Sequence, residues 1–240
     1  MNIFAANIPI CMKLRILSLL IISIHSSLWA QKTGEKDQFS MPSRDYVMLQ
    51  LGYDSWLNAP DSIQITGLGR SLNGYLCYDF PILKSNFSFA AGVGIGTSNI
   101  YFKDQEVLLA DTTSAIQFVP ETQAYKKYKL NATYIEAPFE LRFSGNKENR
   151  NKGFKAAVGL RVGTLAAAHT KGKRTYNNKP ITEKVNTKRY LDSWRYAATL
   201  RLGYGNVSLF GAYQLNGLFR SNSGPEDIRP FSVGICLSGL

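Results

Sequence analysis

Charged side chains recur at alternate positions in segments whose intervening positions are mostly apolar, so in an extended chain they would share one face. Arginine presents two parallel donors to a carboxylate, and such pairs form strong charge-assisted hydrogen bonds. We expect these groups to form salt bridges between neighbouring segments, and the sharper alternative is a path for protons or ions. The residues concerned are Asp79, Glu136, Glu140, Arg142, Lys155, Arg161, Arg195 and Arg201.

A second group of charges is concentrated between residues 169 and 191. Seven basic residues stand there against a single acidic residue, Glu183. Such a segment is either a solvated loop or a surface that meets lipid phosphates or acidic polysaccharide. The basic residues are Lys171, Lys173, Arg174, Lys179, Lys184, Lys188 and Arg189.

Residues suited to catalysis are scarce. The chain has two histidines, His25 and His169, which leaves little material for histidine-built metal sites or acid–base catalysis. Ser193 is a candidate neighbour of His169 for lipid chemistry, but no Gly-x-Ser-x-Gly motif accompanies it. Alternate glycines over residues 92–96 are not followed by a helix, so they do not form a phosphate-binding loop. We therefore predict no catalytic residue, no metal and no cofactor.

The composition favours a folded, β-rich protein. The chain has 240 residues, of which 45% are hydrophobic and 12% aromatic, too many large side chains for a disordered chain. Its formal net charge is +11, and its 3 cysteines are too few for a disulfide scaffold. The 20 glycines and 13 tyrosines suit strands and tight turns better than helices.

The first 30 residues have the organisation of a secretory signal peptide. Lys13 and Arg15 precede an apolar run over residues 16–24, and the segment ends at Ala30. A basic start, a short apolar run and a small residue at the cleavage site are typical of such signals, and the run is too short to span a bilayer. Met12 is an alternative start. Residues 31–43 lack periodicity and are predicted to be a periplasmic tail, and residues 44–240 are predicted to form one domain.

From residue 44 onward, apolar and polar residues alternate with a period of two, which predicts strands. One face of each strand carries large apolar and aromatic side chains. The other face mixes charges with glycine, alanine and serine. The predicted strands cover about 47–54, 71–80, 87–96, 127–143, 154–163, 194–204, 207–216 and 231–238.

The connections between these strands alternate between long and short, which is typical of an outer-membrane barrel with long loops outside and tight turns in the periplasm. The interior of an eight-stranded barrel is just filled by side chains, and this disfavours a path for ions. The alternative is a soluble barrel of the lipocalin type, whose apolar face would point inward. The long connections are 55–68, 98–126, 169–191 and 218–228, and the short ones are 81–86, 144–152 and 205–206.

The strand predicted over 127–143 departs from simple alternation. Its apolar residues change from even positions, such as Leu130, to odd positions from Ile135 onward, and Pro138 lies within it. Proline inside a paired strand usually marks an edge or a bulge. We predict a β-bulge near residues 134–138, and a misplaced strand boundary is the alternative.

Three stretches carry a resemblance to a known family. They are Tyr-Leu-Cys-Tyr-Asp-Phe-Pro over residues 75–81, Tyr-Ile-Glu-Ala-Pro-Phe-Glu-Leu-Arg-Phe over 134–143 and Arg-Pro-Phe-Ser-Val-Gly over 229–234. With the Trp-Ala-Gln end of the leader, they resemble the small outer-membrane barrels of Bacteroidota, known as the PorT-like or porin family. The resemblance covers about residues 45–240 and consists of strand patterns, not of site motifs. It implies a barrel fold and permits a role in envelope assembly or protein secretion.

These observations together predict an all-β protein, an eight-stranded antiparallel up-and-down transmembrane β-barrel in the outer membrane. We expect a polar, plugged lumen, extracellular loops, periplasmic termini and no enzymatic activity. The predicted role is structural or interactive, through contacts with outer-membrane lipid, a surface polyanion or an envelope protein, without nucleic acid and as a monomer. The alternatives are a narrow channel, a secretion-associated barrel and an enzyme that modifies outer-leaflet lipid.

Overall fold

The computed structural model describes residues 47–108, 114–146 and 152–239. The predicted signal peptide and the predicted tail over 31–43 lie outside the described residues. Within the described ranges, no helix is long and apolar enough to cross a membrane. The strands are β1 (Val47–Leu57), β2 (Gly69–Pro81), β3 (Phe87–Phe102), β4 (Gln105–Leu108), β5 (Gln117–Pro120), β6 (Tyr125–Ser144), β7 (Phe154–Tyr176), β8 (Lys179–Asn186), β9 (Trp194–Tyr204), β10 (Val207–Gln214) and β11 (Arg229–Ser238).

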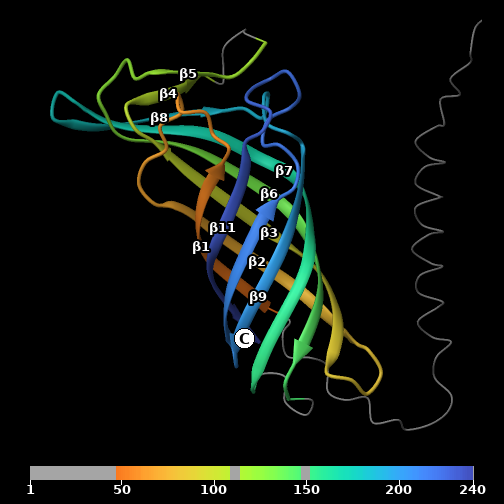
Figure 1. The fold of residues 1–240 in the computed structure, drawn as a ribbon. Coiled ribbons are helices and arrows are strands. Elements are labelled where there is room, and N and C mark those ends of the chain that lie inside the picture. Colours follow the sequence, from red (N-terminus) through yellow and green to blue (C-terminus); the bar gives the residue numbers. More distant parts are fainter. Residues whose placement is uncertain (1–46, 109–113, 147–151, 240) are drawn as a thin grey trace, which may run out of the picture. The chain divides into compact units, whose positions relative to one another are not determined.

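Eight of these strands close into a ring. In ring order they are β1, β2, β3, β6, β7, β9, β10 and β11, each antiparallel to its neighbours (Figure 1). Pairing of β1 with β11 closes the ring, with Met48 opposite Ser238. The predicted all-β, antiparallel up-and-down barrel is therefore confirmed. The two-residue link at 205–206 is a tight hairpin in which Gly205 takes a φ of 63°, a value that favours glycine.

The two ends of the barrel differ. At one end, which we call the turn end, the short connections at 82–86, 145–153 and 205–206 join the strands, and β11 finishes there (Figure 1). At the other, the long-loop end, two of the predicted loops contain paired strands. Within 98–126, β3 continues to Phe102 and β4 pairs with β5, and within 169–191 the extension of β7 pairs with β8. The second of these segments is thus largely a β-hairpin instead of the predicted loop.

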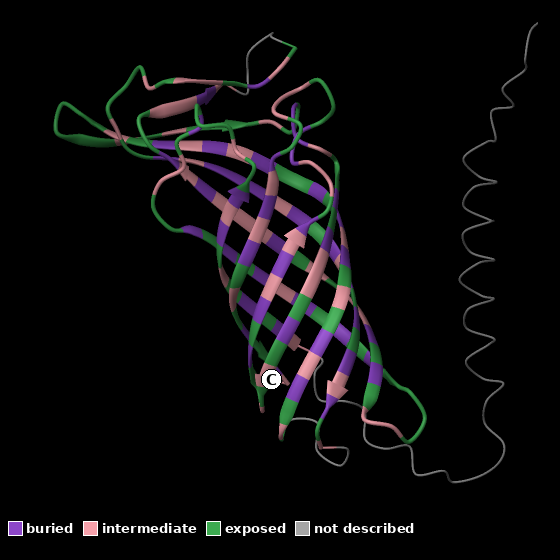
Figure 2. Ribbon diagram, in the orientation of Figure 1, coloured by how far each residue is buried: buried purple, intermediate pink, exposed green. Residues whose placement is uncertain are grey.

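The outer surface of the ring is apolar. Leu51, Leu76 and Leu209 point away from the interior and are each more than 60% exposed. Figure 2 shows the same alternation of buried and exposed positions along the strands of the ring. Aromatic side chains such as Trp194 and Tyr204 lie exposed toward opposite ends of β9. An apolar outer band with aromatic ends is what a bilayer requires, and it is the opposite of a soluble lipocalin-type barrel.

The interior has two layers. Toward the turn end it is lined by buried charged and polar residues, with a small cluster around Met48 and Phe210. Toward the long-loop end it is filled by a larger apolar cluster that includes Trp56 and Leu130. The prediction of a polar lumen is therefore correct only for the half of the interior near the turn end.

This layering explains the irregular pattern of β6. Its even-numbered residues are buried from Tyr128 to the end of the strand, including Leu130 in the apolar layer and Glu136 in the charged layer. The predicted change of facing in this strand is wrong, because the composition of the interior changes and the orientation of the strand does not. The bulge lies in the partner strand, where Thr133 faces Ala167 and Tyr134 faces Leu165, which leaves Ala166 as the extra residue.

Candidate functional site

Glu136 is the centre of the first of two buried charge clusters inside the ring. Its side chain is fully buried, and its Oε1 accepts a hydrogen bond from the Arg195 guanidinium at 3.1 Å. Its Oε2 lies 3.6 Å from the guanidinium of Arg161 and accepts a hydrogen bond from the hydroxyl of Tyr75. The four residues come from β2, β6, β7 and β9, so this one carboxylate links four of the strands.

Two glycines make room for this carboxylate. A Cβ at Gly96 would lie 2.6 Å from Glu136 Oε2, and a Cβ at Gly163 would lie 2.9 Å from Glu136 Cγ. Gly96 belongs to β3, and Gly163 lies directly opposite Glu136 on β7. The small residues predicted on the inward face thus have a specific function, because they leave the space that a buried carboxylate occupies.

The second charge cluster lies nearer the turn end and is centred on Glu140. Its Oε2 accepts hydrogen bonds from Arg142 at 2.7 Å and from Arg201 at 2.9 Å. Arg142 also donates to Asp79 at 2.6 Å, and this brings β2 into the cluster. All four side chains are at most 7% exposed. A buried ion pair must offset the desolvation of its charges with close contacts, and these distances meet that requirement.

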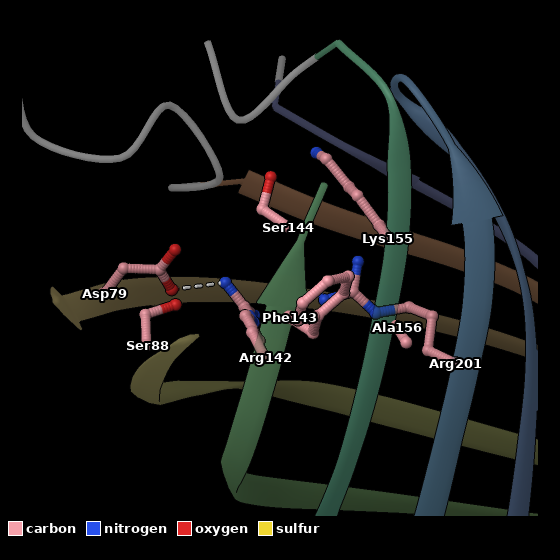
Figure 3. A pocket seen from close by; sticks show the side chains of 8 residues that line it. All are labelled: Asp79, Ser88, Arg142, Phe143, Ser144, Lys155, Ala156 and Arg201. Carbon is pink, nitrogen blue, oxygen red and sulfur yellow. Dashed lines mark hydrogen bonds and ion pairs between the residues drawn. The ribbon is translucent and has the colours of Figure 1, made fainter. Parts of the chain in front are cut away.

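A small pocket opens beside the second cluster. Lys155 of β7 lines it together with Arg142 and Arg201, and Asp79 lies across from them (Figure 3). The pocket has space for about one water molecule. It is therefore suited to hydration of the buried charges and is too small for an organic substrate.

All eight charged residues of the first predicted group are buried inside the ring, but their pairing differs in part from the expectation. Glu136 does pair with an arginine of the next strand, Arg161. Glu140 instead pairs with Arg142 of its own strand and with Arg201 of β9, two strands away. Which arginine meets which carboxylate depends on the stagger of the strands, and strand alternation alone does not specify stagger.

Three inward residues that contact these clusters, Tyr75, Gln50 and Tyr134, were not among the predicted site residues. Tyr75 donates to Glu136, and its ring lies under the Arg161 guanidinium at 4.9 Å. Gln50 accepts hydrogen bonds from Arg161 and Asn73, and Tyr134 stacks with Arg195. The alternation along β2 could have identified Tyr75, because this residue lies between Asn73 and Cys77, which both point inward. Cys77 of β2 and Cys236 of β11 are both buried and free.

The predicted basic segment divides into residues with local partners and residues on an open face. Arg174 pairs with Glu183 at 2.7 Å, and Arg189 lies over the ring of Tyr190. Lys188 donates to the carbonyl oxygens of Leu165 and Ala166 at the bulge. Lys179 lies at the tip of the β7–β8 hairpin, and its side chain is exposed. Lys171, Lys173 and Lys184 remain together on one face of the hairpin.

The candidate catalytic pair has no support from the described contacts. The hydroxyl of Ser193 accepts a hydrogen bond from Arg220 at 3.1 Å. His169 faces Asn131 on one side and Asn186 on the other. Burial is the main cause that lowers the pKa of the His169 imidazole, and the nearby ammonium groups of Lys184, Lys129 and Lys171 lower it further. Among the described residues, no group of three or more histidine, cysteine or acidic side chains is placed to hold a metal ion.

Comparison with known proteins agrees with the architecture. A family model described as outer membrane protein beta-barrel domain matches residues 46–237, a range that includes the eight strands of the ring almost completely. No curated protein and no solved structure matches the chain. The domain supports a location in the outer membrane, in agreement with the apolar outer band. The chain belongs to the family of proteins with an outer membrane protein beta-barrel domain.

Proposed function

We propose that this protein is a non-enzymatic outer-membrane barrel with a closed lumen, which acts in envelope structure or surface interaction through its long-loop end. The observation that carries the proposal is the filling of the interior: two clusters of buried ion pairs near the turn end and an apolar cluster near the long-loop end. Side chains from the connections between the ring strands, among them Ile63, Val107 of β4 and Phe219, belong to the apolar cluster, so these connections and the barrel share one core.

The proposal includes an orientation and a lineage. A signal peptide over residues 1–30 and an even number of strands support periplasmic termini, with the β7–β8 hairpin and the other long connections outside the cell. The stretches that resemble the PorT-like barrels of Bacteroidota lie in β2, β6 and β11 and support membership of that group. A role in envelope assembly or secretion is compatible with a closed barrel, because such a barrel acts through its loops and not through its lumen.

Surface labelling tests the orientation. We expect Thr175→Cys, at the exposed end of β7, to react in whole cells with a maleimide that does not cross membranes. Lys84→Cys, in a short turn, should react only after the outer membrane has been permeabilised. The two native cysteines of the described barrel are buried and give little background. Labelling of Lys84→Cys in intact cells, with Thr175→Cys protected, would reverse the orientation.

Conductance tests the closed lumen. Protein reconstituted in planar bilayers should give no reproducible current, because its inward side chains are buried. The pocket beside Arg142 and the pocket beside Trp56 each have space for only about one water molecule. One observation favours the alternative of a narrow channel: the carboxylate of Asp54 is 2% exposed and neither oxygen has a hydrogen-bond partner among the described atoms. A stable current that Asp54→Asn removes would replace the closed barrel with a channel.

A further inference from the structure

Lysine side chains form two rows across β6, β7 and β8 at the long-loop end. In the first row Lys129 is opposite Lys171, which is opposite Lys184. In the second row Lys127 is opposite Lys173. Because partners in a ladder point to the same side of the sheet, these five residues share one face. We call Lys127, Lys129, Lys171, Lys173 and Lys184 the basic patch.

Among the described residues, no carboxylate forms an ion pair with a lysine of the basic patch. In the described segments 125–131, 169–176 and 179–186, the sole acidic residue is Glu183. Its partner across the ladder is Gly172, so it lies on the opposite face of the hairpin, where it binds Arg174 and the hydroxyl of Tyr125. The charge of the hairpin is thus balanced on one face and unbalanced on the other.

The arrangement of the basic patch is costly for the isolated protein. Like charges directly opposite one another in a ladder are destabilising. Burial lowers the pKa of Lys129, and the nearby charges of Lys171 and Lys173 lower it further. Lys129 is nonetheless held in place, because it donates to Asn99 Oδ1 at 2.6 Å and lies over the ring of Tyr101. An ordered cluster of mutually repelling cations is suited to an anion that offsets the repulsion.

The position of the basic patch indicates which anion. The patch lies on the continuation of the same outward face of β6 that carries Ile135 and Phe139 in the apolar band. Two polar residues, Thr133 and Asn131, separate Ile135 from Lys129 along this face. The order from apolar to neutral polar to basic follows that of a bilayer from hydrocarbon to headgroup, and lysine stems can extend toward the headgroups.

We propose that the basic patch binds the phosphate groups of membrane lipids in the leaflet at the long-loop end. Each lysine near such a surface adds attraction, and several together give a preference for anionic lipid that salt weakens. This binding specifies the surface-interaction role proposed above and rests on that role for its biological meaning. The phosphate contact itself is independent of which side of the membrane the long-loop end occupies.

Native mass spectrometry of the folded full-length protein in a mild non-ionic detergent tests the inference. The probes are phosphatidic acid, phosphatidylcholine and inorganic phosphate. We expect phosphatidic acid to bind on the order of 10-fold or more tightly than phosphatidylcholine, and inorganic phosphate at the same concentration not to displace it. The variant with Lys171→Gln, Lys173→Gln and Lys184→Gln should lose most of this preference.

A matched variant controls for net charge. Lys84→Gln, Lys152→Gln and Lys179→Gln together remove the same number of charges from exposed positions outside the basic patch and should retain the preference. Equal loss in both triple variants, or no preference in the native protein, would overturn the inference. So would binding of a soluble acidic polysaccharide such as alginate that is stronger than binding of phosphatidic acid. If the preference fails while surface labelling succeeds and no current flows, the lipid site is wrong and the closed surface barrel stands.

Discussion

Replacing Glu136 with alanine is expected to destabilise the folded barrel by about 3–5 kcal/mol, because it leaves buried cations without their counter-charge. Arg161 and Arg195 are both at most 5% exposed, and Glu136 is the acidic partner of each in the described ion pairs. Tyr75 would lose the acceptor of its hydroxyl as well. Urea-dependent unfolding in lipid vesicles, followed by tryptophan fluorescence, measures the free energy of unfolding.

Glu183→Ala is the matched control for this substitution. Glu183 also pairs with an arginine, but its side chain is 40% exposed, so its loss should cost less than about 1 kcal/mol. Adding Arg195→Met to Glu136→Ala should recover part of the lost stability, because one uncompensated charge is removed. If Glu136→Ala costs no more than Glu183→Ala, the buried clusters do not hold the strands together in the way described above.

Replacing Gly94 with alanine is expected to destabilise the folded barrel and to lower the fraction of the chain that reaches it. A Cβ at this position would lie 2.1 Å from the carbonyl oxygen of Gly74 and 2.7 Å from the Cα of Tyr75. Both are backbone atoms of β2, so no side-chain rotation relieves the overlap and the two strands must separate. Overpacking in a tight interior typically costs about 1–3 kcal/mol, and contact with backbone is at the upper end of that range.

The fraction of protein that migrates as a compact, unheated band in SDS gels measures this effect, because a folded outer-membrane barrel resists SDS until it is heated. Gly211→Ala is the control: it lies in β10, and a Cβ there would have no atom within 4 Å. Equal yields of the compact band from the two variants would contradict the close approach of β2 and β3 at Gly94.

The strands of the ring were largely predictable because one face of each strand carries charged, polar or small side chains and the other face carries apolar ones. In β9, for example, the alternation of Arg195 and Arg201 with Tyr196 and Leu202 is explicit in the sequence. The β7–β8 hairpin was not predictable in this way, since it has no apolar face and its residues were interpreted as a polar loop. The bulge at Ala166 is equally hidden, because three consecutive alanines at 166–168 give no sign of a change in facing.

The sequence predicts most of the residues that belong to the candidate site, but it does not predict which of them pair with one another. Alternation identified eight of the nine charged residues that are buried among the described positions, and Asp54 was not in the predicted group. The partners of Glu140, however, depend on the stagger of β9 against β6. The apolar layer was missed for a related reason. Leu130 and Tyr134 are inward residues that resemble outward ones, and only the long-loop segments that cover them make an apolar interior favourable.

Closure of the ring by β1 and β11 constrains the order of events in folding. These strands are the first and the last of the described chain. Met48 therefore pairs with a residue, Ser238, that is almost the whole length of the domain away in the sequence. Contacts so distant in sequence form slowly, since much chain entropy is lost before they are made. Until they form, both strands present unpaired amide and carbonyl groups that can recruit other chains. The danger of aggregation for this protein is thus concentrated before the last strand joins the first.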